Sequence, residues 1–94
     1  MNDPINIEAI IELLRQQEPD RTDIIEALQN TTGGRWTNNG YYSFVDSANA
    51  NQPGADWQFD ENIILEQVEK GDVVLDILKG GRVGGIEFIA QIDK

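Results

Sequence analysis

Glycine-rich turns bind phosphate in many proteins, and residues 80–85, GGRVGG, are glycine-rich enough to raise that chemistry. A Walker-type loop requires G-x-x-x-x-G-K-[ST], and the dinucleotide fingerprint requires G-x-G-x-x-G leading into a helix. GGRVGG has neither spacing, and the residues that follow it, IEFIAQI, have the composition of a strand. We therefore interpret Gly80-Gly81 as the turn of a β-hairpin, because glycine adopts positive φ without strain.

Residues 49–60, NANQPGADWQFD, have a partial likeness to a calcium-binding loop. Asn49, Asn51, Gly54 and Asp60 stand at spacings that such a loop uses. Pro53 stands where the loop needs a further oxygen ligand, and the flanking residues predict strands rather than helices. A polar turn built around Pro53-Gly54 is the preferred interpretation, and we assign no metal ligand.

Nucleophilic catalysis needs a base beside the nucleophile, and the chain contains neither histidine nor cysteine. Ser43 and Ser47 have no catalytic motif around them. With seventeen acidic residues in the chain, two carboxylates will approach each other by chance, so their abundance does not indicate acid–base catalysis. We expect no catalytic residues and no cofactor.

The charge of the chain restricts its partners. Seventeen acidic residues against seven lysines and arginines give a net charge of −10 at pH 7. Such a field repels nucleic acids and anionic membranes and favours another protein with a basic surface. No apolar run approaches the roughly 18 residues of a membrane span, and the N-terminal MNDPINIEAI lacks the basic region of a secretory signal. The absence of cysteine is compatible with the cytoplasm, where we expect the protein.

Two helices are predicted at the start of what we expect to be a single domain covering residues 1–94. Ile7, Ile10, Ile11 and Leu14 recur at helical spacing, and the pattern stops before Pro19. A second apolar stripe follows and ends at Gly33-Gly34; its members are Ile24, Ile25, Ala27 and Leu28. The short connection between the stripes predicts a helical hairpin or an L.

Strand patterns occupy the rest of the chain, and we expect them at residues 41–45, 57–68, 72–79 and 82–92. The second is one strand interrupted at residues 60–62, with Trp57, Phe59, Ile63 and Leu65 on one face because their parity is the same. The predicted fold class is α+β, with two N-terminal helices packed on one face of an antiparallel meander sheet of roughly four strands.

A two-residue turn at Gly80-Gly81 specifies the register of the last hairpin. It places Leu75 opposite Ile86, Ile77 opposite Gly84 and Leu78 opposite Val83. One face of the hairpin is then fully apolar, and the other is mixed. Gly84-Gly85 need a separate reason, either a bulge or the close approach of a helix.

The mixed face is our candidate for binding a partner, together with two residues of the segment GGRWTNNG. The candidate residues are Val74, Asp76, Leu78, Val83, Glu87, Trp36 and Arg35. A homodimer is another use of this face, and residues 46–56 are another cover for it. These features favour a small acidic, non-enzymatic protein-interaction module, either an inhibitor of the immunity-protein kind or an adaptor.

The alternative function is a small-ligand or calcium-binding domain built from residues 36–62, which are rich in aromatic and Asn/Asp residues. Exposed aromatic rings beside a polar loop form binding platforms in many proteins. The candidate ligand-binding residues are Trp57, Tyr41 and Tyr42. The competing interpretation places these rings in the core, as small domains commonly do.

Overall fold

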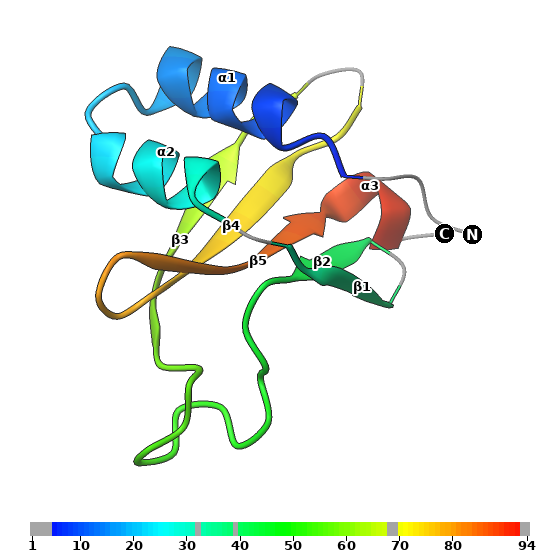
Figure 1. The fold of residues 1–94 in the computed structure, drawn as a ribbon. Coiled ribbons are helices and arrows are strands. Elements are labelled where there is room, and N and C mark those ends of the chain that lie inside the picture. The colour runs from blue at the N-terminus through cyan, green and yellow to red at the C-terminus, as the bar shows by residue number, and fades with distance from the viewer. Residues whose placement is uncertain (1–4, 32, 39, 68–69, 93–94) are drawn as a thin grey trace.

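The computed structural model describes residues 5–31, 33–38, 40–67 and 70–92, and its α+β architecture confirms the predicted fold class. Two helices lie side by side on one face of an antiparallel sheet (Figure 1). The helices are α1 (Ile7–Gln17), α2 (Thr22–Gln29) and the short α3 (Ile89–Ile92). The strands are β1 (Arg35–Asn38), β2 (Tyr41–Ser43), β3 (Phe59–Leu65), β4 (Val73–Leu78) and β5 (Arg82–Phe88).

The sheet has five strands in the order β1-β2-β5-β4-β3. Strands β3, β4 and β5 form a meander, whereas the β1–β2 hairpin joins the sheet through β2 at β5. The additional strand is β1, which forms where Arg35 and Trp36 pair with Ser43 and Tyr42. The connection from β2 therefore has to pass to the far edge of the sheet, and the long loop of residues 44–58 does this (Figure 1).

The core lies between the two helices and the sheet, as the apolar patterns predict. α1 and α2 bury the stripe Ile10, Ile11, Leu14, Ile24, Ile25 and Leu28. The sheet contributes Ile63, Leu65, Val73, Leu75, Ile77, Val83 and Ile86 to the same cluster. Asn6 begins α1 by accepting a hydrogen bond from the Ala9 amide at 3.1 Å, which satisfies one of the free N–H groups of the first turn.

The β4–β5 hairpin turns at the predicted glycines, with φ of 88° at Gly80 and 77° at Gly81. The prediction of a two-residue turn is wrong, because Leu78 pairs with Arg82 and Lys79 joins the glycines in the turn. The predicted register holds where Leu75 pairs with Ile86. Nearer the tip it is wrong by one residue, because Ile77 pairs with Val83 and Gly84 becomes the extra residue of a β-bulge. A one-residue shift moves a side chain to the other face. Val83 accordingly packs in the helix-side core and not on the mixed face.

A second bulge interrupts β3 at the place where the sequence predicts an interruption. Phe59 pairs with Leu78 and Glu61 pairs with Ile77, so Asp60 is the additional residue. The bulge reverses the face of the sheet on which the preceding strand residue lies. Phe59 lies on the face away from the helices, and the prediction that it shares a face with Ile63 is wrong.

An ion pair connects the helical layer to β3. Arg21, which precedes α2, donates from Nη1 to Glu61 Oε1 at 2.9 Å and from Nη2 to Oε2 at 3.2 Å. It also contacts Asp23 at 3.2 Å. The hydrogen bonds to Glu61 and then Asp23 raise the pKa of Arg21, and the hydrogen bond from Arg21 lowers the pKa of Asp23. The paired geometry holds the start of α2 against the edge strand.

We expect Arg21→Lys to lower the free energy of unfolding by roughly 0.5–1 kcal/mol, because an ammonium group cannot bridge both oxygens of Glu61. Urea denaturation near neutral pH measures this difference. The lowered pKa of Asp23 stabilises the fold above the ordinary carboxyl pKa, and this contribution declines as the pH falls. The difference in the free energy of unfolding between the wild type and Arg21→Lys should therefore become smaller at acidic pH.

Arg15→Lys is the matched control, because Arg15 lies on α1 in an exposed pair with Glu12 at 3.6 Å. We expect this variant to unfold like the wild type. Equal losses for Arg15→Lys and Arg21→Lys would show that the pairing with Glu61 has no particular structural role.

Candidate functional site

The face of the sheet turned away from α1 and α2, here called the open face, carries two rows of residues that cross the strands. Directly paired residues share a face, so the register alone defines the rows. The first row is Ile64, Val74, Glu87 and Tyr41. The second row is Asn62, Asp76, Gly85, Ser43 and Arg35. An apolar pair and several charged groups thus lie side by side.

Tyr41 links the two rows of the open face. Its hydroxyl donates a hydrogen bond to Asp76 Oδ2 at 2.7 Å. The ring reaches Asp76 across Gly85, where a methyl group would meet the tyrosine oxygen and lie 2.6 Å from Cζ. Burial raises the pKa of Tyr41, and the hydrogen bond to Asp76 raises it further. The phenol is therefore a neutral donor that orients the Asp76 carboxylate.

Trp57 covers the part of the open face next to the hairpin tip. Its ring lies against Gly84, where a methyl group would be 2.7 Å from Cζ3 and 2.8 Å from Cη2 of the indole. Leu78 approaches the same point to 3.0 Å and is fully buried, while Trp57 is 8% exposed. The sequence left open whether a loop covers this face, and the end of the 44–58 loop does so at this point through Trp57.

Hydrogen bonds hold the end of the loop in place around Trp57. The Asn51 amide donates to the Trp57 carbonyl at 2.8 Å, and Asn51 Oδ1 accepts from the Phe59 amide at 2.9 Å. Arg82 Nη2 donates to the Asp56 carbonyl at 2.6 Å. Asn51 has a φ of 66°, in the left-handed region that asparagine tolerates better than most residues. The loop end that carries Trp57 over Leu78 is thus held by hydrogen bonds within the loop and by one from the hairpin.

The structure brings together part of the predicted partner-binding set. Val74, Asp76 and Glu87 are half-buried neighbours on the open face, and Arg35 is exposed at the end of the second row. Leu78 lies beneath Trp57, and Val83 lies in the core on the helix side.

Trp36, the remaining predicted residue, lies on the helix side of the sheet, because it pairs with Tyr42 and Tyr42 pairs with Ile86. Its ring packs 5.3 Å from that of Tyr42 and 5.5 Å from that of Phe88, measured between centroids. Trp36 is therefore separated from the predicted partner-binding residues of the open face by the thickness of the sheet.

The alternative ligand-binding residues do not converge on one site. Tyr42 lies on the helix side, whereas Tyr41 and Trp57 pack on adjacent glycines of the open face. Asn51, a possible calcium ligand from the sequence, uses its side-chain oxygen to accept from Phe59. Among the described residues, no group of three or more His, Cys, Asp or Glu side chains could hold a metal ion.

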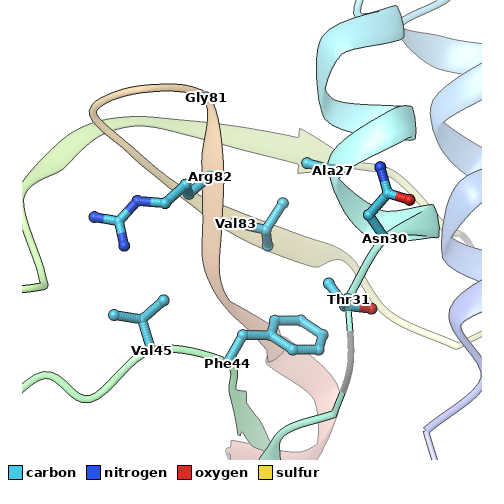
Figure 2. A pocket seen from close by; sticks show the side chains of 8 residues that line it. All are labelled: Ala27, Asn30, Thr31, Phe44, Val45, Gly81, Arg82 and Val83. Carbon is cyan, nitrogen blue, oxygen red and sulfur yellow. The ribbon is translucent and has the colours of Figure 1, made fainter.

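A small pocket of about 300 Å³ lies between the end of α2, Val45 and the hairpin tip (Figure 2). Val83 and the ring of Phe44 form its apolar side, and Asn30 and Thr31 contribute polar atoms. Arg82 extends away from α2 toward the loop, where it bonds to Asp56 (Figure 2). The pocket therefore receives no charged group aimed into it, and its lining does not identify a ligand.

Ile64 and Phe59 are exposed hydrophobic residues that the sequence reasoning did not select. Ile64 is 58% exposed and Phe59 is 38% exposed. Both lie on the open face, Ile64 beside Val74 and Phe59 beside Leu78. The alternation of Ile64 with the buried Ile63 and Leu65 was the signal available for the first, and the bulge at Asp60 concealed the second.

Comparison with known proteins identifies no relative: no family model, no curated protein and no solved structure matches the chain. In the described part of the chain, no helix is long and apolar enough to cross a membrane. Function must therefore be argued from the residues of the open face and its surroundings.

We expect Gly84→Ala to reduce the free energy of unfolding by roughly 1–3 kcal/mol, because the new methyl group overlaps the Trp57 ring. Thermal or urea unfolding measures the loss. The two nearest ring atoms, Cζ3 and Cη2, are absent from phenylalanine, so Gly84→Ala should cost less in a Trp57→Phe background. Additive losses in the double variant would contradict the contact.

Tyr41→Phe should lower the free energy of unfolding by about 1–2 kcal/mol at neutral pH, since Asp76 loses its phenol donor. Because the folded-state pKa of Tyr41 is raised, its contribution is complete below the ordinary tyrosine pKa of about 10 and is lost as the pH rises above it. Denaturation at a series of alkaline pH values should therefore show that the free energy of unfolding falls less in Tyr41→Phe than in the wild type.

Tyr42→Phe controls for removal of a phenol, because Tyr42 lies on the opposite face of the sheet. We expect this variant to lose as much stability at alkaline pH as the wild type loses. If Tyr41→Phe also keeps that loss, Tyr41 is not the group responsible.

Proposed function

We propose that this chain is a small acidic, non-enzymatic protein-interaction module that binds a partner with a basic surface through its open face. The observation that carries the proposal is the row Ile64, Val74 and Glu87 beside Asp76, on the face that α1 and α2 leave uncovered. Apolar side chains and carboxylates are neighbours there. The chain that bears it has a net charge of −10.

Apolar burial would supply the affinity of such a contact. Ile64 exposes 58% of its surface and borders the half-buried Val74. Burying a large aliphatic side chain contributes roughly 1.5–3 kcal/mol relative to full exposure, so Ile64 offers a substantial part of that range. Ile64 and its cross-strand neighbour Val74 form an apolar patch at the edge of the sheet, and exposed apolar patches are typical of interaction surfaces.

Carboxylates would orient the bound partner and raise the rate of association. Asp76 is held by Tyr41, so it can present its remaining acceptor sites in a defined direction. Glu87 lies next to Val74 in the first row. Complementary charge steers a basic partner during encounter and selects against acidic ones. An inhibitor of a basic effector and an adaptor are both compatible with this surface.

The composition of the open face favours binding over catalysis. Tyr41, Asp76, Glu87 and Ser43 are its groups with acid–base or nucleophilic chemistry, apart from Arg35 and Arg82. Tyr41 has a raised pKa and is committed to Asp76, and Ser43 donates to the Val45 carbonyl at 2.8 Å. The hydroxyl–carboxylate pair among these residues is Tyr41 with Asp76, and the raised pKa of Tyr41 keeps its phenol neutral, which supports a binding role.

The test uses the tagged chain as bait in a native lysate, followed by reconstitution with the captured protein in purified form. We expect a partner with a basic surface that is released between about 0.1 M and 1 M salt, as the Debye length shortens from about 10 Å to 3 Å. Glu87→Lys and Ile64→Ser should each weaken binding at least tenfold by calorimetry.

Glu8→Lys is the matched charge control, because Glu8 is exposed on α1 on the other side of the sheet. It should bind within about twofold of wild type at moderate salt. A partner that is lost equally in Glu8→Lys and Glu87→Lys would show binding to overall charge and would overturn the role of the open face.

A further inference from the structure

The outer edge of β3 is closed at both ends by side-chain amides. Gln17, at the end of α1, donates from Nε2 to the Glu66 carbonyl at 2.8 Å and accepts from the Glu66 amide at 2.7 Å. At the other end, Asn51 accepts from the Phe59 amide. The Gln17 amide thus imitates the backbone of a neighbouring strand. In the described part of the chain, no strand lies on the outer side of β3.

Between these two closures the backbone faces outward at defined residues. The direction of hydrogen bonding alternates along an antiparallel strand. Glu66 turns both of its backbone groups to Gln17, so Ile64 and Asn62, two and four residues earlier, turn theirs in the same direction. Their partners in β4, Val74 and Asp76, form the non-hydrogen-bonded pairs of the ladder. Two consecutive donor–acceptor positions are therefore directed away from β4.

The two faces beside this edge differ in chemistry. On the open face, Ile64 and Phe59 are exposed hydrophobic residues. On the helix side, the α1–α2 turn runs along β3, because Gln17 contacts Glu66 and Arg21 contacts Glu61. The exposed carboxylates of this turn are Glu18 and Asp20, and Asp23 follows them in the first turn of α2.

The cation within this turn, Arg21, is already engaged. Arg21 makes hydrogen bonds to both Glu61 and Asp23, so it does not neutralise the remaining acids. A strand added at β3 would bring one set of its side chains beside Ile64 and the alternate set beside the acidic α1–α2 turn. Complementarity then requires apolar residues on one side and lysine or arginine on the other.

We infer that the edge of β3 between Asp60 and Ile64 accepts an extended, basic segment of a partner protein as an additional strand. Main-chain bonds at Asn62 and Ile64 provide the pairing, and the acids of the α1–α2 turn select an alternating basic sequence. This inference rests on the proposed function and specifies how the partner is held. A second copy of this chain fits poorly, since it brings another net charge of −10 to the same edge.

The experiment follows amide hydrogen exchange by NMR during titration with a ten-residue peptide of alternating lysine and valine. We expect exchange at the Asn62 and Ile64 amides to slow by about tenfold or more at saturation. The Glu66 amide should change less, because Gln17 already accepts its hydrogen bond. The same peptide with alternate N-methylated residues has equal charge but cannot pair as a strand, and it should leave the two amides unprotected.

Asn62→Lys provides a variant that preserves the backbone, because Asn62 is exposed and lysine is a natural blocker of sheet edges. We expect it to weaken peptide binding at least tenfold, compared with less than about threefold for Glu8→Gln, which raises the net charge by the same single unit. Thermal unfolding of both variants confirms that they remain folded. Equal effects of the two variants would overturn the inference.

The outcomes separate this inference from the proposed function. If the peptide shifts the resonances of Val74 and Glu87 but leaves Asn62 and Ile64 exchanging freely, strand addition is overturned and binding at the open face stands. If an equivalent glutamate–valine peptide protects the edge as well, selection by charge is overturned. Protection that grows with protein concentration and needs no peptide would identify a second copy as the occupant and overturn the basic segment.

Discussion

Two adjacent glycines on the interior strand β5 determine how the open face is divided. Gly84 lies beneath the Trp57 indole, and Gly85 lies beneath the Tyr41 ring. Neither ring could occupy its place over a residue with a Cβ, because the contacts are shorter than real side-chain carbon atoms allow. The bulge at Gly84 turns both positions toward the same face. One half of the open face is thereby covered, and the half beside β3 stays exposed.

The same packing explains the long crossover from β2 to β3. Trp57 attaches the end of the 44–58 loop to β5, which is a neighbour of both β2 and β4. Burying a tryptophan side chain offsets part of the entropy lost when a long loop becomes ordered. Without that attachment, Leu78 would lose its cover on the open face.

The positions of α1, α2 and the turn of the last hairpin could be predicted because they depend on local patterns, whereas α3 lies in residues 82–92 that were expected to form one strand. Ile10, Ile11 and Leu14 recur at helical spacing, and Gly80-Gly81 supply two residues of positive φ. The acidic character of the surface follows from composition alone.

The face of the sheet on which several side chains lie could not be predicted, because it depends on two bulges created by tertiary packing. The bulge at Gly84 moved Val83 into the helix-side core, and the bulge at Asp60 moved Phe59 out of it. Strand β1 was also missed, since RWTN is short and stands among glycine and asparagine residues that predict turns. The candidate surface therefore kept Val74, Asp76 and Glu87 and gained Ile64 at the edge of the sheet.

The arrangement of aromatic rings on Gly84 and Gly85 can be tested most directly by solution NMR of the intact chain. An aromatic ring packed against a backbone moves the nearby Hα resonances away from their random-coil positions and gives nuclear Overhauser contacts to them. We predict both effects at Gly84 from Trp57 and at Gly85 from Tyr41. Random-coil Hα shifts at the two glycines, without contacts to either ring, would contradict the division of the open face on which the account depends.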